Sequence, residues 1–217
     1  MARTTIGPYH DRPRLRGVSH QWTFFAGLGL AAALLFIAPP GRPRLAALVY
    51  GLSFVALFGV SALLHRRRWE ARGHARMRRL DHSVIYLKIA GTSTPVALLA
   101  LSSAEAAALL ALVWVGAALG VLQSIALPNV PRGVRAAFYV ALGWCVMAEW
   151  PTLRAGLSPL EFGLLAAGGA LYTLGALVYA FRRPDPLPDV FGFHEVFHLF
   201  VVAAAGCHAA MVIALLS

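Results

Sequence analysis

The chain has 217 residues, of which 59% are hydrophobic and only 13% are charged, and its mean hydropathy is +0.69. This composition excludes a water-soluble globular enzyme, because soluble domains carry about 25% charged residues. In a soluble chain the net charge of +10 would suggest nucleic acid as a partner, but in a membrane chain it indicates topology, so we expect no nucleic-acid partner. Cys145 and Cys207 both lie in apolar stretches, which indicates neither a disulfide framework nor a cysteine zinc site.

Long apolar stretches predict an all-α integral membrane protein with seven transmembrane helices, since one crossing needs about 20 apolar residues. The predicted spans are 22–38, 45–64, 82–101, 105–127, 136–153, 160–181 and 192–216. The fifth span is interrupted by Glu149, Trp150 and Pro151. We expect an arginine-rich tail at 1–20 followed by a single seven-helix membrane domain at 21–217.

The basic residues are distributed unevenly between the two sides of this predicted bundle. Fifteen arginines fall in the tail and in the loops after spans two, four and six, whereas the other loops contain only Arg42, Arg44 and Arg154. Loops rich in arginine stay in the cytoplasm. The sequence therefore predicts a cytoplasmic N-terminus and an extracytoplasmic C-terminus.

Polar side chains inside a bilayer are costly and mark functional sites, so the histidines are informative. Three of them fall in the tail or a loop and are expected to be solvated: His10, His20 and His74. Five lie in or at the ends of spans: His65, His82, His194, His198 and His208. The topology places all of these except His208 at the same cytoplasmic depth, together with Asp81.

Three of these histidines form a candidate metal site. His194 and His198 are four residues apart, so both imidazoles project from one face of a helix, and His65 can supply a third nitrogen. Three imidazoles plus water are typical of catalytic zinc, which leaves one position open. Asp81 could orient a ligand or accept a proton from the water, and Ser61 lies one turn before His65.

Each feature of this site has a simpler alternative. The pair His194 and His198 could make an interhelical hydrogen bond, and Asp81 could be a carboxylate at a helix N-terminus. His82 points about 100° away from Asp81, and His208 lies about 21 Å beyond His194 along the helix, so neither is expected to be a ligand.

Residues 194–198 also match the H-E-x-x-H pattern of metalloproteases, in which the glutamate is the general base. The position of a metzincin third histidine is Ala204, so a protease would need His65 or Asp81 as its third ligand, and the sequence disfavours this alternative. Glu195 is then a helix N-terminal carboxylate.

Lys88 is a lysine within a predicted span, which by default is a functional candidate and could suggest an opsin-like Schiff base. The simpler reading is a buried or snorkelling lysine paired with a carboxylate, since Lys88 lies two helical turns after Asp81.

Three segments together resemble the hemolysin III family, the bacterial relatives of the progestin and adipoQ receptors. They are residues 61–65 (SALLH), 78–83 (RRLDHS) continuing to 89–92 (IAGT), and 194–198 (HEVFH). The resemblance covers nearly everything from about residue 17 onward. One departure is Ser93, where the family usually has tyrosine, which places a local packing or substrate contact in doubt.

The resemblance implies a seven-helix protein of the bacterial plasma membrane, with zinc held near the cytoplasmic face by His65, His194 and His198. It also implies that Asp81 hydrogen-bonds the water on the zinc, with Ser61 nearby. The wider superfamily includes alkaline ceramidases with a similar set of serine, aspartate and histidines, which suggests zinc-dependent hydrolysis of lipid amides or esters. Membrane lipids would be the partners, and the oligomeric state is left open.

Two other functions compete with lipid hydrolysis. Zinc could be structural in a non-catalytic membrane homeostasis or signalling protein, where it would tie spans two and seven together. A pore is the third hypothesis, from the family's historical name, but few polar residues lie beyond the cytoplasmic third of the predicted bundle.

Overall fold

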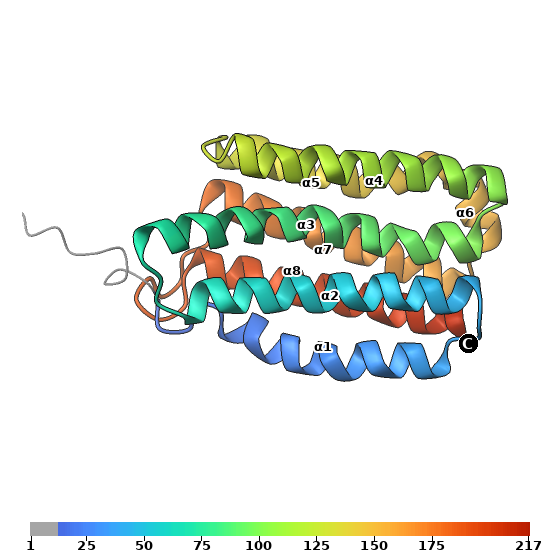
Figure 1. Ribbon diagram of the computed structural model, residues 1–217, viewed down its shortest axis with the longest axis horizontal. Helices are drawn as coiled ribbons and strands as arrows, with labels where there is room; N and C mark the ends of the chain where they lie inside the picture. Colours follow the sequence, from blue (N-terminus) through green and yellow to red (C-terminus); the bar gives the residue numbers. More distant parts are fainter. Residues whose placement is uncertain (1–12) are drawn as a thin grey trace, which may run out of the picture.

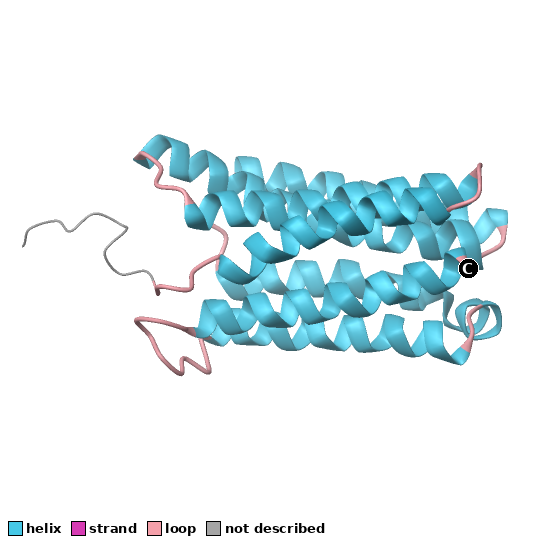
Figure 2. Ribbon diagram, turned by 90° about the horizontal axis from the view of Figure 1, so that it is seen from below, coloured by secondary structure: helices cyan, strands magenta, loops and turns pink. Residues whose placement is uncertain are grey.

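The computed structural model describes residues 13–217, and over that range it is built from helices without a β-strand (Figures 1 and 2). The long helices are α1 (Val18–Ile37), α2 (Arg42–Arg66), α3 (Ala71–Ala100), α4 (Ser103–Ala126), α7 (Pro159–Phe181) and α8 (Phe193–Leu216). These six are long and apolar enough to cross a membrane. The protein is therefore a multi-pass helical membrane protein.

The predicted fifth span, 136–153, is not one continuous helix. Its place is taken by α5 (Arg132–Trp144), a short 3-10 helix η1 (Cys145–Glu149) and α6 (Trp150–Gly156). The break falls at the residues that interrupt the apolar pattern. Pro151 lies in the first turn of α6, where the missing N–H of proline leaves no helical hydrogen bond unmade.

Helix starts differ from the hydropathy boundaries where the first turns are polar. Serine and glutamate form reciprocal capping boxes at the starts of α4 (Ser102, Glu105) and α7 (Ser158, Glu161), close to the predicted positions. By contrast, α3 begins at Ala71 rather than near 82, because arginine-rich turns are good helix formers that hydropathy does not detect.

The expected tail at 1–20 is partly ordered against the rest of the protein. Residues 1–12, which include His10, lie outside the described residues. The backbone N–H groups of Arg14 and Leu15 donate to the carbonyls of Asp189 and Val190, both at 3.0 Å. α1 then begins at Val18, so the end of the predicted tail is the first turn of a helix.

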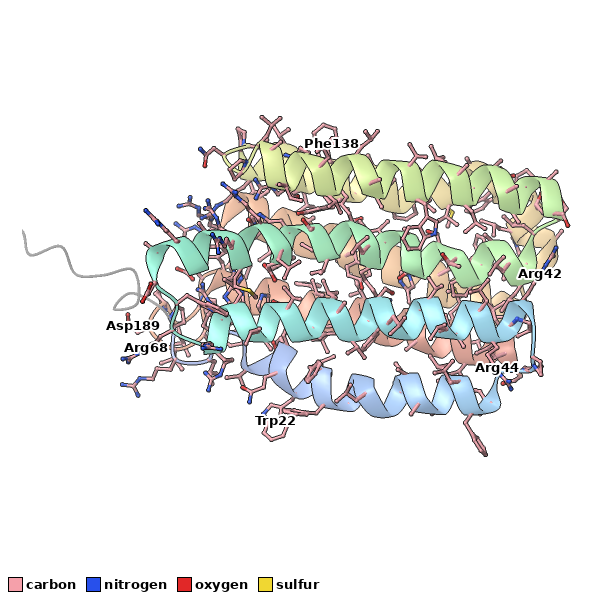
Figure 3. All side chains as sticks on the ribbon, in the orientation of Figure 1. Trp22, Arg42, Arg44, Arg68, Phe138 and Asp189 are labelled. Atoms are coloured by element: carbon pink, nitrogen blue, oxygen red, sulfur yellow. The ribbon has the colours of Figure 1, made fainter. Side chains whose placement is uncertain are left out.

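Successive helices run up and down the long axis of the bundle, and the broken segment from α5 to α6 also covers its length (Figure 1). Arg68 and Asp189 lie at one end, where many nitrogen atoms gather, and Arg42 and Arg44 lie at the other (Figure 3). Trp22 and Phe138 point outward and are 68% and 55% exposed. Apolar side chains on the outer surface are expected where lipid surrounds a bundle.

Candidate metal centre

Three histidines meet at the arginine-rich end of the bundle. His65 lies in the last turn of α2, and His194 and His198 lie in the first two turns of α8. Each offers one ring nitrogen, and these three nitrogens lie within 4.8 Å of one another. His198 is 2% exposed, while His65 and His194 are half-buried. The tertiary structure therefore brings together the three side chains that the sequence singled out.

The spacing of these nitrogens fits a shared metal ion. The Nε2 atoms of His65 and His194 are 3.2 Å apart. Two nitrogens bound to a tetrahedral zinc at about 2.0–2.1 Å would be separated by about 3.3 Å. A single hydrogen bond would explain this pair, but it would not explain a third imidazole that also presents a nitrogen to the same point. The triad could therefore hold a metal.

Asp81 and Ser61 lie beside the triad and are linked to each other. The Ser61 hydroxyl is a hydrogen-bond partner of the Asp81 carboxyl group. Ser61 Oγ also lies 2.8 Å from Nδ1 of His20. Because a carboxylate only accepts, the hydroxyl donates to Asp81, and the Nδ1–H of His20 donates to Ser61. A chain of three side chains from α1, α2 and α3 thus ends at the carboxylate.

The expectation that His20 is solvated is wrong. His20 is 2% exposed, and its ring stacks on that of His198, with centroids 3.7 Å apart and planes 7° from parallel. The pattern that could have indicated burial of His20 is its seven-residue spacing from Gly27 and of Gly27 from Leu34, since these three are the buried residues of α1. Sequence reasoning missed His20 because hydropathy placed the start of α1 two residues after it.

The remaining histidines have other partners. Arg135 donates to the ring of His82, and His208 Nε2 lies 3.2 Å from the carbonyl oxygen of Leu165. His74, which was expected to be solvated, is half-buried near the start of α3. Neither His82 nor His208 belongs to the metal-compatible group of the described residues.

Glu195 has a structural role at the start of α8. Its carboxylate accepts the backbone N–H of Gly192 at 2.8 Å and forms an ion pair with Arg16. A glutamate occupied in this way fits a helix N-terminal carboxylate, as expected, rather than a protease general base.

Two cavities adjoin the triad. The inner cavity, of about 160 Å³, is lined by His194, His198 and Asp81 and extends between the helices to Lys88 and His208. The outer cavity, of about 280 Å³, has a strongly basic lining: Pro13, Arg14, Arg16, His65, Arg66, Arg67 and Arg68. The triad therefore contributes His65 to a basic cavity and His194 and His198 to a mostly apolar one.

The backbone of Gly17 packs closely against the side chain of His65. Gly17 has φ +79°, and a Cβ atom built there would lie 2.5 Å from Cβ of His65. Gly17→Ala should therefore cost about 1–2 kcal/mol in backbone strain and displace His65. We expect a lower melting temperature and weaker metal retention, measured by competition with a chelator.

Gly29→Ala, in the helix that follows Gly17, is the matched control, because a Cβ at Gly29 meets nothing within 4 Å. Gly29→Ala should retain metal as the parent does. Equal metal retention by Gly17→Ala would show that the contact with Gly17 does not position His65.

Comparison with known proteins agrees with the arrangement of these residues. The family described as "Haemolysin-III related" matches residues 9–209. "Hemolysin-3" of Bacillus cereus is 35% identical over 163 residues, which cover 72% of this chain and 68% of that protein. "Monocyte to macrophage differentiation factor" of Homo sapiens is 30% identical over 172 residues, covering 76% and 68%.

A shorter likeness reaches "Adiponectin receptor protein" of Drosophila melanogaster, which is 38% identical over 73 residues, covering 31% of this chain and 16% of that protein. The family match spans far more than half of the chain and includes all three histidines of the triad. The chain therefore belongs to the hemolysin III family, which is related to the adiponectin receptors.

Proposed function

We propose that this protein is a zinc-dependent hydrolase of lipid amides or esters. One observation carries the proposal: the triad His65, His194 and His198 adjoins a basic cavity and a largely apolar one, with Asp81 beside it. A purely structural metal site needs neither a cavity nor a neighbouring carboxylate. A hydrolase of an apolar substrate needs both.

Zinc, when bound, would activate water and polarise the substrate carbonyl. Asp81 lines the inner cavity, where its carboxylate can accept the proton that the attacking water loses. Ser61 donates a hydrogen bond to this carboxylate and so fixes its orientation. His20 holds Ser61 and also stacks on His198, so it positions both a proton-handling residue and a ligand imidazole.

The inner cavity provides the place for an acyl chain. Between the triad and its far end the walls include Ile85, Ile89, Leu165, Phe197 and Val201. Such walls exclude water and bind methylene groups through burial of apolar surface. The basic outer opening would admit water and the polar end of the lipid, which places the reacting carbonyl between the two cavities.

We also infer seven crossings of a bacterial plasma membrane, with the segment from α5 to α6 as the fifth. This segment covers the length of the bundle, and arginines gather at the end that holds the triad (Figures 1 and 3). The positive-inside rule then places that end, with the tail at 1–20, in the cytoplasm. A single membrane domain at 21–217 would contain both the metal centre and the cavity.

Removal and return of the metal test the function directly. Metal-stripped protein should hydrolyse none of a panel of lipid amides and esters, and stoichiometric zinc should restore turnover, measured as released fatty acid. A hydrolase is contradicted if zinc restores thermal stability but no panel member is ever cleaved. That result would favour a structural metal that joins α2 to α8.

A further inference from the structure

Lys88 lies deep in the inner cavity without a carboxylate partner. It is 3% exposed, and its Nζ lies 3.6 Å from the centroid of the Tyr50 ring. Nζ has no hydrogen-bond partner, and Lys88 forms no ion pair within residues 13–217. The expected pairing with a carboxylate near the mouth is therefore absent from the described residues. A buried amine that donates to nothing requires another explanation.

Two further unpaired polar atoms belong to the same cavity. Tyr172 Oη and His208 Nδ1 are buried without hydrogen-bond partners in the described part of the chain, and both residues line the cavity with Lys88. The rings of Tyr172 and His208 are 5.7 Å apart, and His208 is close enough to Lys88 to interact electrostatically. We call Lys88, Tyr172 and His208 the deep cluster.

Packing and hydrogen bonds with neighbouring helices hold the deep cluster in place. The His208 ring packs directly on Gly168, where any Cβ would collide with it, and its Nε2–H donates to the Leu165 carbonyl at 3.2 Å. The Lys88 amine lies above the Tyr50 ring, whose hydroxyl in turn donates to the Ala205 carbonyl at 3.2 Å. These contacts fix the rings and the amine, so the unpaired atoms keep their positions.

The hydrogen-bonding capacities of the deep cluster select the group that it can bind. The Lys88 amine can donate, and Tyr172 can donate or accept. Because Nε2 of His208 donates to a carbonyl, Nδ1 is the acceptor of the neutral ring. A carboxylate has no proton to give to this nitrogen, and a methylene group satisfies none of the three. A hydroxyl group can accept from Lys88 and Tyr172 through its two lone pairs and donate to His208, so it can satisfy all three.

We propose that the deep cluster binds a hydroxyl group carried on the acyl chain of the ligand. This inference rests on the proposed function, because it places the reacting carbonyl at the metal centre and the chain in the cavity. Lys88 follows Asp81 by seven residues in α3, which corresponds to about 10 Å along the helix axis. The protein therefore selects lipids whose chain carries a hydroxyl group at about that distance from the carbonyl.

The cavity is large enough for this role. A single buried water needs a cavity volume of about 10–15 Å³, and the inner cavity has a volume of about 160 Å³. An ordered water could satisfy one or two of the unpaired atoms, but it would give no preference between ligands. Discrimination between hydroxylated and plain chains therefore separates a ligand site from a hydrated pocket.

The test measures binding rather than turnover. Saturated fatty acids of increasing length, and the ω-hydroxy acids of the same lengths, compete with a radiolabelled plain fatty acid for the purified full-length protein in detergent. We expect an ω-hydroxy acid of matching length to bind on the order of 10-fold more tightly than its plain partner, since its hydroxyl group gives a hydrogen bond to an amine that is otherwise buried and unpaired.

Lys88→Met removes the amine but keeps an unbranched chain, and it should abolish the preference. Tyr172→Phe removes one hydroxyl without changing the ring, and it should reduce the preference for the ω-hydroxy acid. This second variant tests the site even if Lys88→Met does not fold. Ser93→Ala is the matched control, because Ser93 lines the same cavity from α3 but donates to the Ile89 carbonyl at 3.2 Å. It should keep the full preference.

The proposal is overturned if no length shows a preference, if the preference survives Lys88→Met, or if neither acid displaces the label. The same titration on metal-stripped protein separates this proposal from the hydrolase. If the preference for the ω-hydroxy acid persists without metal and the protein never cleaves a lipid, only the hydrolase proposal is contradicted. If the protein hydrolyses lipids but binds both acids equally, only the hydroxyl-site proposal is contradicted.

Discussion

Replacing His194 and His198 together by alanine should reduce the bound metal from about one ion per chain to none. The two imidazoles supply two of the three nitrogens that lie within 4.8 Å of one another, and His65 alone is a weak ligand. Elemental analysis of detergent-purified protein measures the change. A lower melting temperature should accompany it, because metal binding contributes to the stability of the folded state.

His208→Gln is the matched control for this experiment, since His208 lies in the same helix but outside the triad. Its metal content should equal that of the parent. Metal that remains in the double variant would place the ion elsewhere, and a well-folded parent without metal would remove the basis of the hydrolase proposal.

Asp81→Asn should lower lipid turnover on the order of 10²- to 10⁴-fold while the metal stays bound. Asparagine keeps the size of the side chain and its acceptor for Ser61, but it cannot take a proton from water. The expected loss is the usual contribution of a positioned general base. Released fatty acid and metal content, measured on the same preparation, separate proton transfer from loss of the site.

Glu149→Gln is the matched control for charge, because Glu149 lies in η1, outside both the triad and the cavity lining. It should hydrolyse lipid at the parent rate. Turnover by Asp81→Asn at the parent rate would exclude Asp81 as the base, and loss of metal in that variant would instead assign Asp81 a role in holding the ligands.

The local sequence pattern was sufficient to predict most of the helices and the three histidines that could hold a metal. Apolar runs mark the long helices because a bilayer demands them, and the capping boxes at Ser102 and Ser158 mark where two of them begin. The spacing of His194 and His198 is a property of one helix, so it could be read directly. The same pattern failed from 136 to 153, where Pro151 starts a new helix.

Contacts between segments that are far apart in the sequence could not be predicted from local sequence patterns. Hydropathy located neither His20 against His198 nor Gly17 against His65, because polar first turns hide the start of α1. The sequence offered a partner for Lys88 at Asp81, two turns away on the same helix. The structure instead places the amine over Tyr50, a residue of α2.

The sequence by itself determined that the chain is a helical membrane protein and which three histidines could bind a metal, because helix periodicity and bilayer thickness act within single segments. Only the tertiary structure decided that His20 hydrogen-bonds Ser61 beside the triad and that Glu195 forms an ion pair with Arg16. It also decided that Lys88 lines the same cavity as His194 and His198. These facts depend on which faces of packed helices meet, and side-chain packing between helices is not encoded in the pattern of any one of them.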